Sequence, residues 1–283
     1  MACLHRSGHR VALLAPHDAG SALVGPGPGE VRLLLPWESA RIAELFTEAG
    51  PSAALRETLG GFDAAVAFSR DADLARNLGA VIPRLVVHDP MPPAGSGHAA
   101  EWLARAVSSL APCAEGPPVL EATSDEADRA AALVRDLPPR FLAVHPGSGS
   151  PSKTWPADRF ARLLDALGAD RFLLVEGPAD AAAAAALRGR GGAVLARGLT
   201  ARVLGAALAR AAAFVGSDSG VSHLAAAWGA PTMALFGPTD PGVWSPVGPR
   251  VTVLRSPHAR MDGIGVDVVA ARIAPLLAET GPR

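Results

Sequence analysis

The sequence lacks an excess of one charge, a cysteine framework and any long hydrophobic run. It has 26 basic and 27 acidic residues, so its formal net charge is -1. Without a clustered basic face, no nucleic-acid partner is expected. The two cysteines, Cys3 and Cys113, cannot form a disulfide framework and do not have metal-ligand spacing. The composition therefore predicts a cytoplasmic protein with no metal site.

Apolar runs of membrane-spanning length are also missing. The N-terminal run Val11–Ala15 is too short for the core of a signal peptide, and no other run reaches the length of a transmembrane helix. Tyrosine is absent, while alanine, glycine and arginine are abundant. Because alanine raises helix propensity wherever it occurs, we interpret Ala-rich segments such as Ala181–Ala186 as solvent-facing helix, with no functional meaning.

What the sequence does contain is an alternation of short apolar runs with helical segments. With 283 residues and 49% apolar composition, the chain is long enough for two domains with separate cores. Strands alternating with helices predict an α/β fold with parallel sheets of βαβ units. The strands are expected at Val11–Ala15, Val31–Leu35, Ala64–Phe68, Leu85–Val87, Phe141–Val144, Phe172–Val175, Ala193–Leu195, Ala212–Val215, Thr232–Phe236 and Val251–Leu254.

Proline and glycine divide these runs into two sets. A Pro/Gly loop at 88–98 precedes a helix expected at 99–110. A second Pro-rich stretch leads to Thr123 and Glu126, which have the spacing of a capping box. Near the end of the chain, apolar residues at helical spacing predict an amphipathic helix over 266–278. We therefore expect a first domain at 1–123, a second at 124–265 and a C-terminal helix at 266–283.

The most informative stretch runs from Val215 to Thr239. The strand that reaches Val215 passes into a polar elbow, 217–220, and then into a short helix that Gly229 and Pro231 end. Ligands bind at this edge of an open α/β sheet, where the amide groups and the dipole of a helix N-terminus favour an anion. The elbow is therefore interpreted as a seat for a phosphate or diphosphate.

A second polar loop follows the strand expected at Phe141–Val144. From His145 to Lys153 it contains His-Pro-Gly-Ser-Gly-Ser-Pro-Ser-Lys, and Pro156 is well placed to begin the next helix. Glycines permit close approach of the backbone, serines supply hydroxyl groups, and Lys153 supplies a mobile positive charge for phosphate oxygens. The Walker spacing is absent, so this loop alone is equally compatible with an ordinary βα loop bearing an exposed lysine.

Taken together, the two loops resemble a known family. The order His-Pro-Gly-Ser-Gly, Lys-x-Trp-Pro, a strand ending in Glu176-Gly177, Asp-Ser-Gly-x-x-His and Phe-Gly-Pro-Thr resembles the heptosyltransferases of lipopolysaccharide core synthesis, glycosyltransferase family nine. The resemblance is close over 139–260 and concerns only the general plan before that. It implies a GT-B architecture, with two Rossmann-like parallel-sheet domains facing across a cleft. The C-terminal domain would hold a nucleotide-sugar donor and the N-terminal domain the acceptor.

The resemblance also implies roles for single residues. Lys153, with Ser148 nearby, would pair with the diphosphate and stabilise the charge of the leaving group. The backbone amides of Asp218, Ser219 and Gly220 would face the phosphates, whereas the Asp218 carboxylate would hold sugar hydroxyls, because two anions repel. His223 would add a donor beside the same phosphates unless it only packs the helix. Glu176 would bind the ribose hydroxyls, although a solvated strand-end acid fits the sequence equally well. Further donor contacts are expected from Gly149, Ser219, Gly220, Val221, Pro238 and Thr239.

The N-terminal part departs from the family pattern. Family members begin with a strand and a Gly-Asp loop whose aspartate is the proposed catalytic base, whereas this chain starts at what resembles the end of the first helix. A shortened first domain is therefore expected. The nearest replacement base is Asp18, beside His17 after the first expected strand, although an aspartate there is more often a helix cap. His88 and Asp89 form a similar strand-end pair, and His98 is a further candidate.

The resemblance predicts a glycosyltransferase that uses a nucleotide-diphosphate sugar, for example one like ADP-heptose. Its acceptor would be a hydroxyl of a glycan or lipid-linked lipopolysaccharide core at the inner membrane surface, and transfer would proceed with inversion, without metal or cofactor. The shortened first domain favours one alternative, a catalytically inactive nucleotide-sugar-binding module. Another is a nucleotide-sugar epimerase, which the same fold also supports. Loss of an edge strand would expose backbone and apolar surface that a homodimer would cover.

Overall fold

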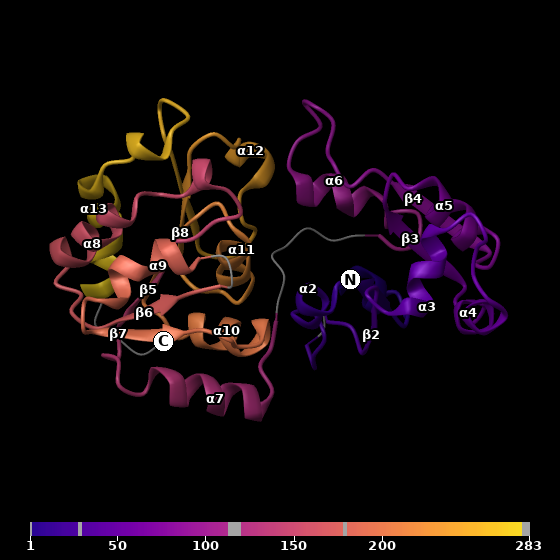
Figure 1. Ribbon diagram of the computed structural model, residues 1–283, viewed down its shortest axis with the longest axis horizontal. Helices are drawn as coiled ribbons and strands as arrows, with labels where there is room; N and C mark the ends of the chain where they lie inside the picture. The colour runs from indigo at the N-terminus through magenta and orange to yellow at the C-terminus, as the bar shows by residue number, and fades with distance from the viewer. Residues whose placement is uncertain (1, 28–29, 113–119, 178–179, 279–283) are drawn as a thin grey trace. The chain divides into compact units, whose positions relative to one another are not determined.

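The computed structural model describes residues 2–27, 30–112, 120–177 and 180–278. The chain separates into two compact units (Figure 1). The N-terminal unit consists of Met1–Val24 and Pro28–Gly116, and the C-terminal unit of Gly25–Gly27 and Pro117–Arg283. Each unit has a hydrophobic core of its own.

The described part of the C-terminal unit contains a sheet of six parallel strands. The strands are β5 (Leu142–His145), β6 (Phe172–Val175), β7 (Ala193–Ala196), β8 (Ala213–Ser217), β9 (Thr232–Phe236) and β10 (Val251–Arg255). Their order in the sheet is β10-β9-β8-β5-β6-β7. The four inner strands are buried over their whole length, as expected for apolar strands covered on both faces. Because β5 lies beside β8, the winding of the sheet reverses between these two strands, as in the Rossmann fold.

Helices cover both faces of this sheet (Figure 1). One face carries α8 (Ala157–Ala166), α9 (Ala181–Arg188) and α13 (Val266–Ala278), and the other carries α7 (Ser124–Val134), α10 (Ala201–Leu208) and α11 (Gly220–Ala227). Leu142 and Val144 of β5 pack on the first side and Ala143 on the second, which follows the two-residue period of a strand. The remaining described elements of the unit are α12 (Pro241–Trp244) and the 3-10 turns η2 (Pro151–Lys153) and η3 (Met261–Gly263).

The strands described in the N-terminal unit form two separate parallel pairs. β1 (Ala12–Ala15) pairs with β2 (Leu33–Pro36), and β3 (Ala64–Phe68) pairs with β4 (Arg84–His88). These strands are short and only partly buried, so the core of the unit comes mainly from helical leucines and isoleucines. The helices are α1 (Ala2–Arg6), α2 (His17–Ser21), α3 (Ala40–Ala43), the 3-10 turn η1 (Glu44–Phe46), α4 (Ala53–Leu59), α5 (Ala72–Gly79) and α6 (Ala99–Arg105).

Every apolar run that predicted a strand coincides with one, and the ends differ by at most two residues. The predicted capping box also forms. The amide of Glu126 donates to Thr123 Oγ1 over 3.3 Å, and the amide of Thr123 donates to Glu126 Oε2 over 2.9 Å. The C-terminal helix, α13, has the predicted bounds. The α/β prediction and the main helical boundary signals are therefore confirmed.

Two helix predictions need correction. The helix expected at 99–110 ends at Arg105. In the turn that follows, the Ser108 hydroxyl donates a hydrogen bond to the carbonyl of Arg105 over 2.7 Å. The Ala-rich segment is helical as α9, but it does not simply face solvent, because Ala184 is completely buried in the core. None of the helices in the described residues is both long and apolar enough to cross a membrane.

Candidate functional site

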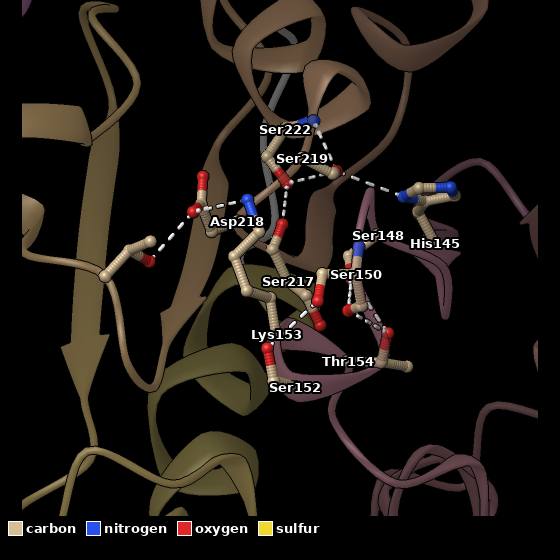
Figure 2. A network of polar contacts seen from close by, with 11 residues as sticks. His145, Ser148, Ser150, Ser152, Lys153, Thr154, Ser217, Asp218, Ser219 and Ser222 are labelled. Carbon is tan, nitrogen blue, oxygen red and sulfur yellow. Dashed lines mark hydrogen bonds and ion pairs between the residues drawn. The ribbon is translucent and has the colours of Figure 1, made fainter.

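The loops that follow β5, β8 and β9 meet at the carboxyl edge of the C-terminal sheet (Figure 2). In the sheet register His145 of β5 lies opposite Gly216 of β8, and Ser217 of β8 lies opposite Leu235 of β9. Open α/β sheets bind their ligands at this edge, next to the strands between which the winding reverses. The loops that the sequence predicted as a phosphate seat therefore follow neighbouring strands.

Lys153 is held at this edge by a carboxylate from another loop. Its ammonium group lies 3.1 Å from Asp218 Oδ2, and the Thr239 hydroxyl donates to the same oxygen over 2.8 Å. The side chain of Asp218 is 9% exposed and that of Lys153 27% exposed. Lys153 is also the only lysine of the chain, whose 25 other basic residues are arginines. A single compact ammonium charge, partly open to solvent, is thus placed where a ligand would approach.

Hydroxyl groups close the loop that carries Lys153. Ser148 Oγ donates to the carbonyl of Ser150 over 2.5 Å and lies 2.8 Å from Thr154 Oγ1. Thr154 Oγ1 lies 3.1 Å from the same carbonyl. The first role of Ser148 is therefore to shape the loop (Figure 2). Gly149 is exposed, and a Cβ atom built there would meet nothing within 4 Å, so the loop backbone is open at this point.

The elbow after β8 ends in a capped helix N-terminus. Ser219 is the N-cap residue of α11, and its hydroxyl accepts from the amide of Ser222 over 3.4 Å. Ser217 ties the elbow to the lysine loop, because its hydroxyl accepts from the amide of Trp155 over 3.0 Å. Gly220 opens the helix and is exposed, with nothing within 4 Å of a Cβ built on it. The first turn of α11 therefore offers amide groups and a positive dipole end to an anion. The expected contribution of the Asp218 amide is wrong, because that amide donates to the carbonyl of Leu235 over 3.0 Å.

A buried histidine at the end of β5 contacts both the elbow after β8 and the loop after β6. His145 Nδ1 lies 3.2 Å from Ser219 Oγ, and His145 Nε2 lies 2.9 Å from Asp180 Oδ2. The side chains of His145 and Asp180 are 3% and 11% exposed. The hydrogen bond from His145 holds the pKa of Asp180 below its ordinary value. Sequence reasoning assigned no role to either residue, although His145 ends a buried strand at the ligand-binding edge.

Glu176 occupies the predicted place directly after β6, but arginines surround its carboxylate. Arg188 Nη1 donates to Glu176 Oε1 over 3.0 Å, and Arg197 Nη1 lies 3.7 Å from the same oxygen. The Glu176 side chain is 1% exposed. The carboxylate is therefore a buried, charge-paired group and does not match the alternative of a solvated strand-end acid.

The other predicted donor contacts lie on the same edge with different exposure. His223 is exposed on α11, one turn after Gly220, and Val221 beside it is partly buried. Pro238 is exposed in the loop after β9. Among the described residues, no group of three or more His, Cys, Asp or Glu side chains is arranged to hold a metal ion. Cys113 lies outside the described residues.

The predicted bases lie in the N-terminal unit in different environments. Asp18 is in the first turn of α2 with a fully exposed side chain, and His17 Nδ1 lies 3.6 Å from its Oδ1. The Asp18 side chain does not cap the helix, since the N-cap residue of α2 is Pro16. Asp18 therefore has an accessible carboxylate that no cap hydrogen bond occupies.

The strand-end pair His88 and Asp89 is engaged in local structure. His88 Nε2 lies 3.0 Å from the carbonyl of Trp102. The single N–H of Arg70 Nε is shared between Oδ1 and Oδ2 of Asp89, at 2.9 and 3.0 Å, and this bond holds the pKa of Asp89 below its ordinary value. The hydrogen bond from Arg70 and the lowered pKa make Asp89 a weaker base than a free carboxylate. His98 is the N-cap residue of α6, where its Nδ1 accepts from the amide of Ala100 over 3.1 Å.

Three solved structures, of two heptosyltransferases and a family 9 glycosyltransferase, are similar to this chain. E. coli ADP-heptose LPS heptosyltransferase II matches with a TM-score of 0.75 and 19% identity, over 98% of this chain and 92% of that one. A family 9 glycosyltransferase from Veillonella parvula DSM 2008 gives 0.76 and 18%, over 96% and 89%. E. coli heptosyltransferase WaaC with ADP gives 0.70 and 19%, over 97% and 93%. These similarities establish the GT-B fold.

The family itself is decided by the sequence match. Comparison with curated protein sequences gives no match. A family model described as glycosyltransferase family 9 (heptosyltransferase) matches residues 103–263, more than half of the chain. The matched range includes both site loops and all of the donor residues discussed above. The chain therefore belongs to glycosyltransferase family 9, the heptosyltransferase family.

Proposed function

We propose that this glycosyltransferase takes its sugar from a nucleotide-diphosphate donor of the ADP-heptose type, bound to the C-terminal unit. The observation that carries the proposal is the convergence of Lys153, Asp218 and Thr239 beside the first turn of α11. A lysine and a helix N-terminus on one sheet edge are the groups that hold phosphates in many α/β enzymes. The ADP in the similar WaaC structure supports ADP as the first nucleotide to test.

Different residues of this site bind different parts of the nucleotide-sugar donor. Lys153 and the amides of Ser219, Gly220 and Val221 hold the diphosphate, because positive charge and N–H groups suit its oxygens. Asp218 holds hydroxyl groups of the sugar, since a carboxylate repels phosphate but accepts from hydroxyls. Thr239 fixes Asp218 and, with Pro238, lines the phosphate side. Ser148 and Gly149 line the opposite side of the diphosphate site, and His223 provides a further donor beside the diphosphate.

Glu176 is assigned to the ribose. Its carboxylate is buried and held by Arg188 and Arg197, so ribose binding requires an exchange of partners. Hydroxyl groups that replace the guanidinium groups would keep the buried carboxylate hydrogen-bonded. The arginines, released on the exposed side, would then remain close to the nucleoside.

The reaction we propose is a single displacement with inversion. The acceptor oxygen forms a bond to the anomeric carbon while the bond from that carbon to the diphosphate oxygen breaks. The nucleoside diphosphate leaves with the bonding electrons, and a base takes the proton of the acceptor hydroxyl. Lys153 and the α11 amides stabilise the charge that grows on the leaving group, and a metal ion is not required for that task. Asp18 is the base we propose, on the basis of its accessible carboxylate.

The remaining assignments concern the acceptor and its location. We assign the acceptor, a hydroxyl of a glycan or lipid-linked core of the lipopolysaccharide type, to the N-terminal unit, and the donor to the C-terminal unit. The reaction is placed in the cytoplasm at the inner membrane surface, where nucleotide sugars and such acceptors would meet. A homodimer would cover the apolar side chains exposed in the N-terminal unit, which include Leu33, Trp37 and Phe68.

Calorimetry tests the proposal with ADP, UDP, GDP and dTDP. One of them should bind the wild-type chain, and Lys153→Ala should weaken that binding by roughly 10- to 100-fold, as expected for loss of a charged hydrogen bond. Arg162→Ala is the matched control, because it removes a positive charge from an exposed ion pair on α8 of the same unit. Transfer from the corresponding nucleotide sugar should continue in EDTA. If none of the four nucleotides binds, the donor proposal is wrong.

A further inference from the structure

His145 is a buried polar side chain for which the transfer reaction provides no direct use. Its imidazole ring lies between Asp180, in the loop after β6, and Ser219, in the elbow after β8. It is 3% exposed, so it does not meet the donor itself. A buried imidazole that bonds through both ring nitrogens to side chains of two other loops fixes the distance between those loops.

Asp180 sets the direction of the hydrogen bond that it shares with His145, and this in turn determines the role of the other ring nitrogen, which faces Ser219. A carboxylate only accepts, so the His145 proton is on Nε2 and is donated to Asp180 Oδ2, over 2.9 Å. In the neutral ring Nδ1 is then an acceptor, 3.2 Å from Ser219 Oγ. Ser222 Oγ, 3.3 Å from Ser219 Oγ, is a second acceptor for the Ser219 proton, because the Ser222 hydroxyl donates its own proton to the carbonyl of Ser217 over 2.6 Å. We assign the Ser219 proton to the shorter contact, with His145. The lone pairs of Ser219 Oγ stay available for the amide of Ser222, which is the cap bond of α11.

Asp180 is itself held in one place. The amide of Gly177 donates to its Oδ2 over 2.9 Å. Its carboxylate packs on the backbone of Gly147, where a Cβ atom would lie 1.8 Å from Asp180 Oδ1. The His145 hydrogen bond also keeps the pKa of Asp180 low, in agreement with a carboxylate anion at this place. The imidazole is therefore supported from behind by a fixed acceptor.

We infer that His145 is a positioning residue for the donor diphosphate, which orients the Ser219 hydroxyl, and with it the first turn of α11, from a fixed hydrogen bond to Asp180. This inference rests on the proposed function, because it concerns the same diphosphate. Without the imidazole, the Ser219 hydroxyl is free to rotate away from its cap position, and the amides of the first turn lose a fixed orientation toward the phosphates.

Two substitutions of His145 separate its two hydrogen bonds. The side-chain amide of His145→Asn takes the place of Nδ1, so it keeps a partner for Ser219 and gives up Asp180. The amide of His145→Gln takes the place of Nε2, so it keeps a partner for Asp180 and gives up Ser219. We expect His145→Gln to weaken ADP binding about five- to tenfold, the effect of one hydrogen bond. His145→Asn keeps the contact with Ser219 but loses its support from Asp180, so it should have a smaller effect, of about threefold, and AMP binding should be unchanged in both variants.

A double-mutant cycle distinguishes positioning through Ser219 from simple packing. If His145 acts through Ser219, the effect of His145→Gln on ADP affinity disappears in a Ser219→Ala background. An equal effect in both backgrounds, or none in either, overturns the inference while Lys153-dependent ADP binding leaves the proposed function intact. If UDP, GDP or dTDP binds more tightly than ADP, that nucleotide and its monophosphate take the place of ADP and AMP. A wild-type chain that binds no nucleoside diphosphate overturns both.

Imidazole nitrogen NMR gives a second readout that does not depend on the His145 variants being folded. In the wild-type chain His145 should be the Nε2–H tautomer, and its Nδ1 resonance should shift on addition of ADP and in Ser219→Ala. A proton on Nδ1, or an Nδ1 resonance that responds to neither change, contradicts the inference.

Discussion

Lys153 and Asp218 are 65 residues apart in the sequence, and their side chains meet with 3.1 Å between Nζ and Oδ2. The contact joins the loop after β5 to the elbow after β8, two strands that lie side by side in the sheet (Figure 2). Without a donor, the carboxylate is the counter-ion of the lysine. A diphosphate that binds Lys153 must therefore compete with Asp218, and this competition gives opposite predictions for the two residues.

Asp218→Asn should separate nucleotide binding from sugar transfer. Removing the competing charge should leave the affinity for the free nucleoside diphosphate unchanged or raise it severalfold, because Lys153 then has no anionic partner. The transfer rate should fall by at least about tenfold, since the amide is a poorer acceptor for the sugar hydroxyls. Calorimetry and a donor-consumption assay measure the two effects. Asp158→Asn, in the exposed ion pair on α8, is the control and should change neither. A parallel loss of nucleotide affinity and rate in Asp218→Asn would contradict this assignment.

Arg188→Ala should destabilise the C-terminal unit. It leaves the carboxylate of Glu176, which is 1% exposed, with only the longer contact to Arg197 of those two arginines. A buried charge that loses its main hydrogen bond costs about 1–3 kcal/mol in the free energy of unfolding. Urea denaturation would show this as a lower midpoint, and the exposed Arg171 provides a control by substitution to alanine. Equal midpoints for the two variants would mean that the arginine does not stabilise Glu176.

Gly147 and Gly149 should differ sharply when each is replaced by alanine. A Cβ at Gly147 would lie 1.8 Å from Asp180 Oδ1, whereas one at Gly149 would meet nothing within 4 Å. Gly147→Ala must displace the carboxylate or the loop, at a cost of roughly 1–3 kcal/mol, as overpacking does. Gly149→Ala should change the free energy of unfolding by less than about 0.5 kcal/mol. Thermal unfolding of both variants tests the difference, and equal melting temperatures would show that Asp180 does not pack on Gly147.

Asp180 also gives the chain a dependence of stability on pH. The hydrogen bond from His145 lowers the pKa of Asp180 below its ordinary value of 3.8. A lowered pKa in the folded state stabilises the fold above the ordinary value, and that stabilisation is lost as the pH falls through the folded pKa. The difference in unfolding free energy between wild type and Asp180→Asn should therefore be constant above about pH 5 and shrink as the pH decreases from about 5 to about 2. Urea denaturation across this range measures it, and a constant difference would contradict the prediction.

The sequence predicted the strands and the positions of the polar loops that follow them, because local patterns determine both. Thr232–Phe236 has four apolar residues after its threonine and is bounded by Pro231 and Gly237, so a buried strand between two turns is the simplest solution. The order of strand, polar elbow and helix from Ala213 to Ala227 is also local, because it follows from where apolar runs stop. In both cases the signal lies within the segment itself.

The polar partners inside the site were not predictable in the same way. His145 and Asp180 are 35 residues apart, and nothing in either segment indicates that the loops meet. Glu176 was expected to face a ribose, but its arginine partners lie on α9 and just after β7, and only the fold brings them together. The pairing of strands in the N-terminal unit is likewise a property of tertiary packing, since the same apolar runs are compatible with one sheet or two.

Chemical protection of Lys153 tests the central claim most directly. Because it is the only lysine of the chain, an amine-specific acetylating reagent modifies only Lys153 and the α-amino group, and mass spectrometry of the peptides follows both rates. A saturating nucleoside diphosphate should slow modification of Lys153 by about fivefold or more, with the matching monophosphate less effective and the α-amino group unaffected. If Lys153 reacts at the same rate with and without a nucleotide that calorimetry shows to be bound, the diphosphate does not bind at this lysine.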